Sequence, residues 1–159
     1  MRRIIIFCIC IIALFMFSGC KHIDINNQTY MDIKSYDVAV IKSQPSSGKN
    51  NTETKLIYSK FDLLLFQLKY DIKDETSIYN GDYFTDKALV VCIFSTSHMG
   101  SHFGVKSIKI SEECLLVTFK NNETKESNYC DVLSECVCII EVKKEEVDKS
   151  LKVITEYEQ

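Results

Sequence analysis

Seven apolar residues in a row, at positions 88–94, constrain the fold of this chain more than any other stretch. The run reads Ala-Leu-Val-Val-Cys-Ile-Phe, so both faces of a strand formed there would be apolar. Strands of this kind occur in sheets that are covered on both faces. The run therefore predicts a central strand with a helix on one face and further structure on the other.

One amphipathic helix is expected before this strand. Apolar residues recur at i, i+3, i+4 and i+7, the spacing of one helix face; they are Phe61, Leu64, Leu65 and Leu68. Ser59 is a good N-cap residue, and Asp62 in the first turn suits the helix dipole. Leu63 and Phe66 widen the apolar arc. We expect the helix to lie buried on the sheet and to end near Tyr70.

Further strands are expected where the sequence is apolar or alternates with a period of two. These stretches are 36–42, 52–58, 103–110, 114–120 and 134–143. The alternation slips within 103–110, which predicts a β-bulge near Lys106 and Ser107. The tail at 151–157 fits either an edge strand or a short helix. The elements predict an α+β fold, with one main helix packed on a predominantly antiparallel β-sheet of about six strands.

The N-terminus has the layout of a secretory signal peptide. A basic start and an apolar run over residues 4–17 are followed by Ser18-Gly19-Cys20. The run is too short for a membrane-spanning helix, which needs about 20 apolar residues. The chain is therefore expected to divide into a signal peptide at residues 1–19, a flexible tether at 20–34 and a single α+β domain at 35–159.

The ending Ser18-Gly19-Cys20 resembles the lipobox of bacterial lipoproteins. In that family a diacylglycerol group is attached to the cysteine thiol, and the signal peptide is cut just before this cysteine. The resemblance implies that Cys20 is the lipidation site. Two acyl chains suffice for durable anchoring. The resemblance thus implies a lipid-anchored protein on the extracytoplasmic face of the cell membrane.

The charge of the expected mature chain argues against nucleic acid as a partner. Removing the signal peptide takes away Arg2 and Arg3 and no acidic residue, which leaves 22 acidic against 17 basic residues. Binding to nucleic acid or to anionic lipid headgroups depends on a basic surface. Contact with the membrane is therefore expected through the acyl chains alone.

The expected mature chain keeps an odd number of cysteines besides Cys20. They are Cys92, Cys114, Cys130, Cys136 and Cys138. A disulfide framework normally uses an even set, and free cysteine packs as a small apolar residue. We expect packing roles here; the alternative is one or two disulfides, from Cys130 to Cys136 or between neighbouring strands. Cys136 and Cys138 are about 6.6 Å apart along one strand face and cannot easily bridge.

The densest group of candidate site residues is the loop that follows the central strand. It contains His98, Met99, Gly100, Ser101 and His102, which we treat as a candidate binding loop. The two histidines and Cys92 raise the question of a metal site. Gly100 and the small residues indicate a loop, on which the i, i+4 spacing does not bring two histidines together, and no glutamate follows His98. No metal or cofactor is predicted.

Catalysis is not predicted either. Cys92 lies in the most apolar run of the chain, where burial would raise its pKa and leave the thiol inert. The sequence contains no Gly-x-Ser-x-Gly elbow, no glycine-rich phosphate loop and no paired-carboxylate motif. The acidic pairs lie in turns and near the C-terminal end, where a solvated face is the default. The chain is therefore expected not to be an enzyme.

Three stretches between about residues 58 and 147 resemble the C-terminal domain of the PrcB-like family, extracytoplasmic proteins of a protease complex. Residues 83–91 are similar to that family's strand entry, and Met99-Gly100-Ser101 with the following strand is similar to its glycine-serine loop. Residues 130–131 and 136–144 resemble its Cys-Asp segment and final Ile-Glu-Val-x-Lys strand. The resemblance implies a non-catalytic accessory domain that binds and stabilises an exported protease complex.

Three functional hypotheses follow. The first is a membrane-anchored, non-catalytic accessory subunit that binds an exported protease or another envelope protein. The second is a lipoprotein that binds a small ligand or a cell-envelope component, which a deep pocket ringed by aromatic side chains would support. The third is a thiol or metal enzyme that uses Cys92, His98 and His102.

Overall fold

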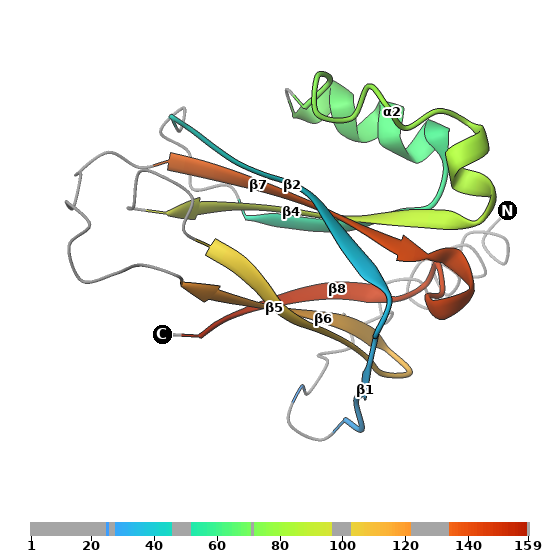
Figure 1. The fold of residues 1–159 in the computed structure, drawn as a ribbon, viewed down its shortest axis with the longest axis vertical. Helices are drawn as coiled ribbons and strands as arrows, with labels where there is room; N and C mark the ends of the chain where they lie inside the picture. The colour runs from blue at the N-terminus through green and yellow to red at the C-terminus, as the bar shows by residue number, and fades with distance from the viewer. Residues whose placement is uncertain are drawn as a thin grey trace, which may run out of the picture.

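The described part of the chain folds into two four-stranded β-sheets that face each other, with one α-helix on the outer side of one sheet (Figure 1). The computed structural model describes residues 25, 28–45, 52–70, 72–96, 103–121 and 134–158, and the statements below concern these residues. Figure 1 shows the resulting three layers, with the helix above one sheet and the other sheet below it.

The strands of each sheet come from distant parts of the chain. The β4–β7 sheet has the order β2 (Tyr36–Pro45), β7 (Ser134–Lys143), β4 (Lys87–Thr96) and β3 (Glu53–Ile57). The β5–β6 sheet has the order β1 (Met31–Asp32), β5 (Phe103–Ile110), β6 (Cys114–Asn121) and β8 (Lys152–Glu158). Two short 3₁₀ helices, η2 (Asp82–Thr85) and η3 (Lys144–Glu146), flank β4 and β7.

The prediction of one sheet with about six strands was wrong, although the α+β class is confirmed. The described residues contain eight strands in two sheets. The error arises because alternation shows that a strand is half buried, but not which strands pair with it. All pairings are antiparallel except that of β6 with β8, so the sheets are predominantly antiparallel as expected.

The prediction for residues 88–94 is confirmed. They lie in β4, which pairs with β7 on one side and with β3 on the other. Side chains at even positions, such as Val90 and Cys92, lie in the core between the two sheets. Those at odd positions, such as Leu89 and Val91, pack in the core beneath the helix. Both faces of β4 are therefore apolar because each one contributes to a separate hydrophobic core.

The predicted helix is present with the expected ends. α2 (Lys60–Lys69) begins after Ser59, whose side-chain oxygen accepts a hydrogen bond from the Asp62 backbone N–H at 3.1 Å. The helix ends at Tyr70, which takes up an extended conformation. The N-cap residue Ser59 thus located the start of the helix, and the extent of the amphipathic stretch located its end.

The predicted inward face of α2 was wrong. Leu63 and Phe66 are the buried residues of the helix, whereas the four residues at helical spacing are exposed; they are Phe61 (67% exposed), Leu64 (47%), Leu65 (47%) and Leu68 (80%). The reason is that residues after the helix, including Tyr79 and Phe84, fill the core beneath it. Only a narrow part of the helix surface therefore contacts the sheet.

Both predictions about the later strands are settled. The register of β5 against β6 shifts between Val105 and Ser107, which confirms the predicted bulge. The C-terminal tail forms the strand β8 rather than a helix, and it lies at the edge of the β5–β6 sheet beside β6. The Thr54 hydroxyl donates a 2.8 Å hydrogen bond to the Val153 carbonyl, which joins β3 to β8 across one side of the sandwich.

The packed domain begins earlier than residue 35. Met31 and Asp32 pair with β5, and Ile33 is buried in the core between the sheets. Gln28 hydrogen-bonds the turn between β5 and β6. The tether expected at residues 20–34 therefore includes four residues that these contacts place in the domain, namely Gln28, Met31, Asp32 and Ile33. No helix in the described part of the chain is long and apolar enough to cross a membrane.

Candidate functional site

Several of the predicted site residues lie outside the described residues. These are Cys20, Cys130 and the whole candidate binding loop His98, Met99, Gly100, Ser101 and His102. Their predicted roles stay predictions. Among the described residues, no group of three or more histidine, cysteine, aspartate or glutamate side chains could hold a metal ion.

The described cysteines are buried free thiols. Cys92 and Cys138 lie opposite each other on β4 and β7, and Cys136 follows on the same face of β7. Burial raises the pKa of Cys138 to about 12 and that of Cys136 to about 11, and it raises the pKa of Cys92 well above its ordinary value. These thiols stay protonated at neutral pH and pack as small apolar side chains, which removes Cys92 as a ready nucleophile.

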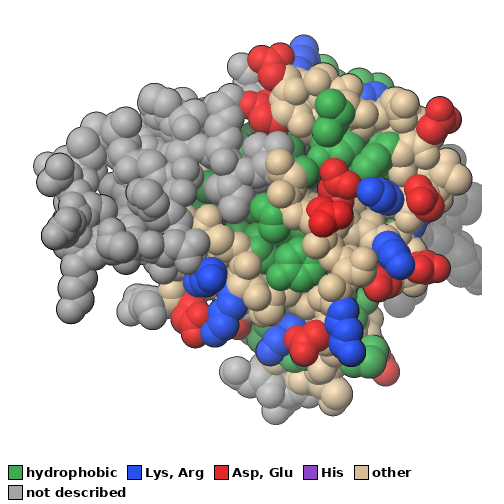
Figure 2. Space-filling view, viewed as in Figure 1, with side chains coloured by type: hydrophobic (Ala, Val, Ile, Leu, Met, Phe, Trp, Pro, Cys, Tyr) green, Lys and Arg blue, Asp and Glu red, His purple; other side chains and the backbone are tan. Residues whose placement is uncertain are grey.

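The most unusual surface of the domain is the outer side of α2, formed by Phe61, Leu64, Leu65 and Leu68, which we call the α2 face. These side chains are between about half and four-fifths exposed, while Leu63 on the opposite side of the helix is fully buried. Figure 2 shows hydrophobic side chains at the surface over α2, near the top of the view, with charged side chains of both signs around them. Single exposed apolar residues are ordinary, but a contiguous group marks an interaction site.

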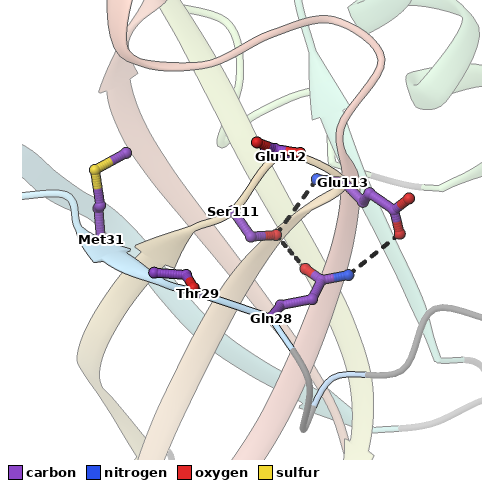
Figure 3. Close-up of a pocket in the computed structure, with 6 residues that line it drawn as sticks. All are labelled: Gln28, Thr29, Met31, Ser111, Glu112 and Glu113. Atoms are coloured by element: carbon purple, nitrogen blue, oxygen red, sulfur yellow. Dashed lines mark hydrogen bonds between the residues drawn. The ribbon is translucent and has the colours of Figure 1, made fainter.

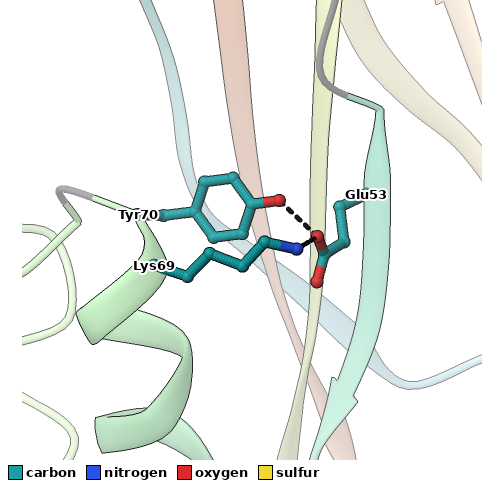
Figure 4. Close-up of polar contacts among 3 residues, drawn as sticks. All are labelled: Glu53, Lys69 and Tyr70. Carbon is teal, nitrogen blue, oxygen red and sulfur yellow. Dashed lines mark hydrogen bonds and ion pairs between the residues drawn. The ribbon is translucent and has the colours of Figure 1, made fainter.

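One edge of the α2 face is charged. Asp62 and Lys69 lie seven residues apart on the same side of the helix. Lys69 forms an ion pair with Glu53 on β3, and the Tyr70 hydroxyl donates to the same carboxylate (Figure 4). Burial works against ionisation of Glu53, but the hydrogen bonds from Lys69 and Tyr70 outweigh it and lower the pKa of this carboxyl. These contacts fix the C-terminal end of α2 to the sheet.

The other edge of the α2 face is held by the segment that follows the helix. The Gln67 amide donates a 2.6 Å hydrogen bond to the Thr76 hydroxyl, and the Lys60 ammonium donates a 2.8 Å bond to the Tyr79 carbonyl. Ile78 lies in this segment and is 71% exposed. The α2 face therefore lies between two fixed edges and is a firm surface with a further apolar residue beside it.

The α2 face can bind an apolar surface but has no reactive group for chemistry. Covering an exposed leucine or phenylalanine side chain stabilises a complex by about 1–2 kcal/mol when half or more of it starts in water. The helical spacing in the sequence did single out these four residues. It assigned them to the core, however, because periodicity alone does not say which side of a helix meets the sheet.

A pocket of about 450 Å³ lies where the N-terminal segment meets the turn between β5 and β6 (Figure 3). Its lining consists of Gln28, Thr29, Met31, Ser111, Glu112 and Glu113. The Ser111 hydroxyl donates to the Gln28 side-chain oxygen, and the Gln28 amide donates to Glu113 at 3.2 Å. These bonds join the side chains of Gln28, Ser111 and Glu113 and hold the N-terminal segment on the domain. The sequence predicted the turn but not its pairing with Gln28.

A second pocket, of about 490 Å³, lies between η2 and the end of β7 and contains several lysines. Each lysine already has an acceptor. Lys87 pairs with Glu141 at 3.2 Å, Lys143 lies 3.8 Å from Glu145, and Lys144 donates to the Phe84 carbonyl at 2.6 Å. The lysines of this pocket thus have acceptors within the chain, and nothing in their arrangement indicates an anion site.

Comparisons with protein-family models, curated proteins and solved structures found no match to this chain. The resemblance of its motifs to the PrcB-like family therefore remains a prediction. Among the described residues, the α2 face is the surface feature that most favours a binding role.

Proposed function

We propose that this chain is a lipid-anchored, extracytoplasmic and non-catalytic protein that binds an exported protease or another envelope protein through the α2 face. The observation that carries the proposal is the exposure of Phe61, Leu64, Leu65 and Leu68 on a helix that is fixed at both edges. A preformed apolar helix face lowers the cost of ordering on binding. The partner that fits it presents a matching apolar surface, with a basic group near Asp62 and an acidic group near Lys69.

The membrane anchor in this proposal rests on Cys20 and the signal that precedes it. Replacing Cys20 by serine should abolish incorporation of labelled fatty acid and leave uncut precursor, while Cys138→Ser should keep the label and reduce only stability. The measurement is metabolic labelling of cells that produce the full chain, followed by gel electrophoresis. Persistent labelling of the Cys20→Ser protein would overturn the anchoring claim.

The binding role is tested by crosslinking in intact cells, followed by capture of the tagged full chain and mass spectrometry. We expect an exported protease or another envelope protein to be recovered, and we expect Leu68→Glu to abolish its recovery. Thr85→Glu is the matched control, because it adds the same charge at an exposed position in η2, which borders the second pocket and is not part of the α2 face. Equal recovery with both variants, or recovery of no envelope protein by the unmodified chain, would refute the proposal.

Neither rival hypothesis has comparable support. Among the described residues, the lining of the pocket at Gln28 includes no aromatic side chain, and the polar groups of Gln28, Ser111 and Glu113 are bonded to one another, so these groups offer little to a small ligand. A thiol enzyme would need Cys92 to ionise, which its complete burial opposes. The alternative that the chain is a metal enzyme is tested by zinc analysis of the purified full chain, together with His98→Ala and His102→Ala. Absence of bound zinc and of any effect of the two substitutions would exclude it.

A further inference from the structure

We propose that the α2 face packs in antiparallel orientation against the α2 face of a second copy of this chain. The inference rests on the membrane anchor of the proposed function, and it adds a second copy of the chain as an occupant of the docking surface besides another envelope protein. The shape of the face, the charges along its edge and the area that it offers all fit this arrangement.

The shape of the α2 face suits packing against a copy of itself. Its side chains form two ridges at i, i+4 spacing, one from Phe61 to Leu65 and the other from Leu64 to Leu68. Helices pack by placing such ridges into the grooves between the ridges of a partner. The centre of the face lies between Leu64 and Leu65, so a two-fold axis there brings Phe61 against Leu68 of the second copy.

The charges favour the antiparallel orientation. Asp62 and Lys69 lie on the same edge, near opposite ends of the helix. The two-fold axis of an antiparallel pair is perpendicular to both helices and lies in the plane between them. It reverses the direction of the second helix but keeps the charged edges of the two copies on the same side of the interface. Asp62 then faces Lys69 of the second copy, and the same ion pair forms a second time by symmetry. Antiparallel helix dipoles also attract, whereas parallel ones place their positive ends together.

Lys69 remains accessible at the edge of the α2 face. Its side chain is 61% exposed although it pairs with Glu53, so a further carboxylate can approach it from solvent. Asp62 is held near the helix start by the Ser59 hydroxyl at 2.7 Å. Both charges are therefore ordered along the edge of the α2 face before any partner binds.

The area of the face predicts a pairing that depends on the membrane. Side chains of this kind bury on the order of 100 Å² each, so the four from each copy give a total well below the 1,200–2,000 Å² typical of stable complexes. Such an interface is weak between freely diffusing copies. Anchoring of two copies in one membrane raises their effective concentration, as tethering does in general.

The test is cysteine crosslinking in the membranes of cells that produce the full chain, using a short bis-maleimide. Leu65→Cys lies beside the two-fold axis and should crosslink to itself. Phe61→Cys and Leu68→Cys should each fail alone, because the two copies of either site are about 10 Å apart along the helix. Coexpressed with different tags, these two variants should crosslink to each other. Thr85→Cys, away from the face, should stay monomeric, and the unmodified chain reports any background from native cysteines.

Two results would overturn the inference. Absence of the Leu65→Cys crosslink would exclude a second copy at the α2 face. Self-crosslinking of Phe61→Cys or Leu68→Cys would show a parallel arrangement. Melting curves of each variant verify that the domain stays folded.

The outcome separates this inference from the proposed function. If Leu65→Cys does not crosslink while Leu68→Glu still abolishes capture of another envelope protein, the function stands and the second copy is excluded. If the crosslinks form as expected but no other protein is recovered, the pairing stands and the accessory role fails.

Discussion

The orientation of α2 can be tested with two neighbouring leucines. Leu63 is fully buried in the core beneath the helix, whereas Leu64 is 47% exposed on the α2 face. Both substitutions, Leu63→Ala and Leu64→Ala, remove the same atoms from the same helix and gain the same small helix propensity of about 0.2 kcal/mol. A difference in their free energies of unfolding therefore reports burial alone.

The expected magnitudes differ by several kcal/mol. Leu63→Ala removes about three buried methylene equivalents, worth about 2.4 kcal/mol, and leaves a cavity that raises the total loss to about 3–4 kcal/mol. Leu64→Ala should change the free energy of unfolding by about 0.5 kcal/mol or less. For a domain whose total stability is about 5–15 kcal/mol, the first loss is large.

Urea unfolding followed by far-ultraviolet circular dichroism measures both values, since the chain has no tryptophan. With an m-value of about 1–3 kcal/mol/M, the Leu63→Ala midpoint should fall by at least about 1 M and that of Leu64→Ala by much less. Low protein concentration keeps any pairing through the α2 face from adding to the result. If Leu64→Ala costs as much as Leu63→Ala, the α2 face belongs to the core and the docking proposal fails with it.

Three further outcomes are expected. Ser59→Ala should lower the free energy of unfolding by about 1 kcal/mol, because it removes the N-cap of α2; an unchanged urea midpoint would contradict this. Cys92 and Cys138 should resist a thiol reagent in the native chain and react in urea, because burial suppresses their ionisation; rapid native labelling, read by mass spectrometry, would show that the core opens. The pKa of Glu53 is lowered by folding, so its interactions stabilise the chain above its ordinary pKa of 4.5 and are lost as the pH falls below it. Between neutral pH and about pH 3, the free energy of unfolding of Glu53→Gln should therefore fall by less than that of the unmodified chain, as measured by urea denaturation. Equal decreases would count against the Lys69 contact.

The parts of the fold that were predicted correctly depend on neighbours in the sequence. The ends of α2 follow from the cap at Ser59 and from the amphipathic stretch that it precedes. The bulge in β5 follows from a slip in the alternation that any partner strand would have to accommodate. The burial of β4 on both faces follows from its unbroken apolar run. In each case the signal lies within about ten residues of the feature.

The candidate site was visible only in part. The four residues of the α2 face were identified by their spacing, but they were assigned to the core. The pocket at Gln28 was missed, because it joins residues more than eighty positions apart through hydrogen bonds. The burial of Cys92 was predicted correctly, since the unbroken apolar run around it already indicated an inert thiol.

By itself the sequence determined the local elements of this protein, the expected export signal and the absence of recognised catalytic motifs. The tertiary structure decided that the strands divide into two sheets and that α2 turns Leu63 and Phe66 inward. The physical reason is that apolar residues on a helix become buried only where apolar side chains from other parts of the chain pack against them. Tyr79 and Phe84 occupy the space beneath α2 that the longer stripe would have filled. That stripe, Phe61 to Leu68, was thereby left on the surface.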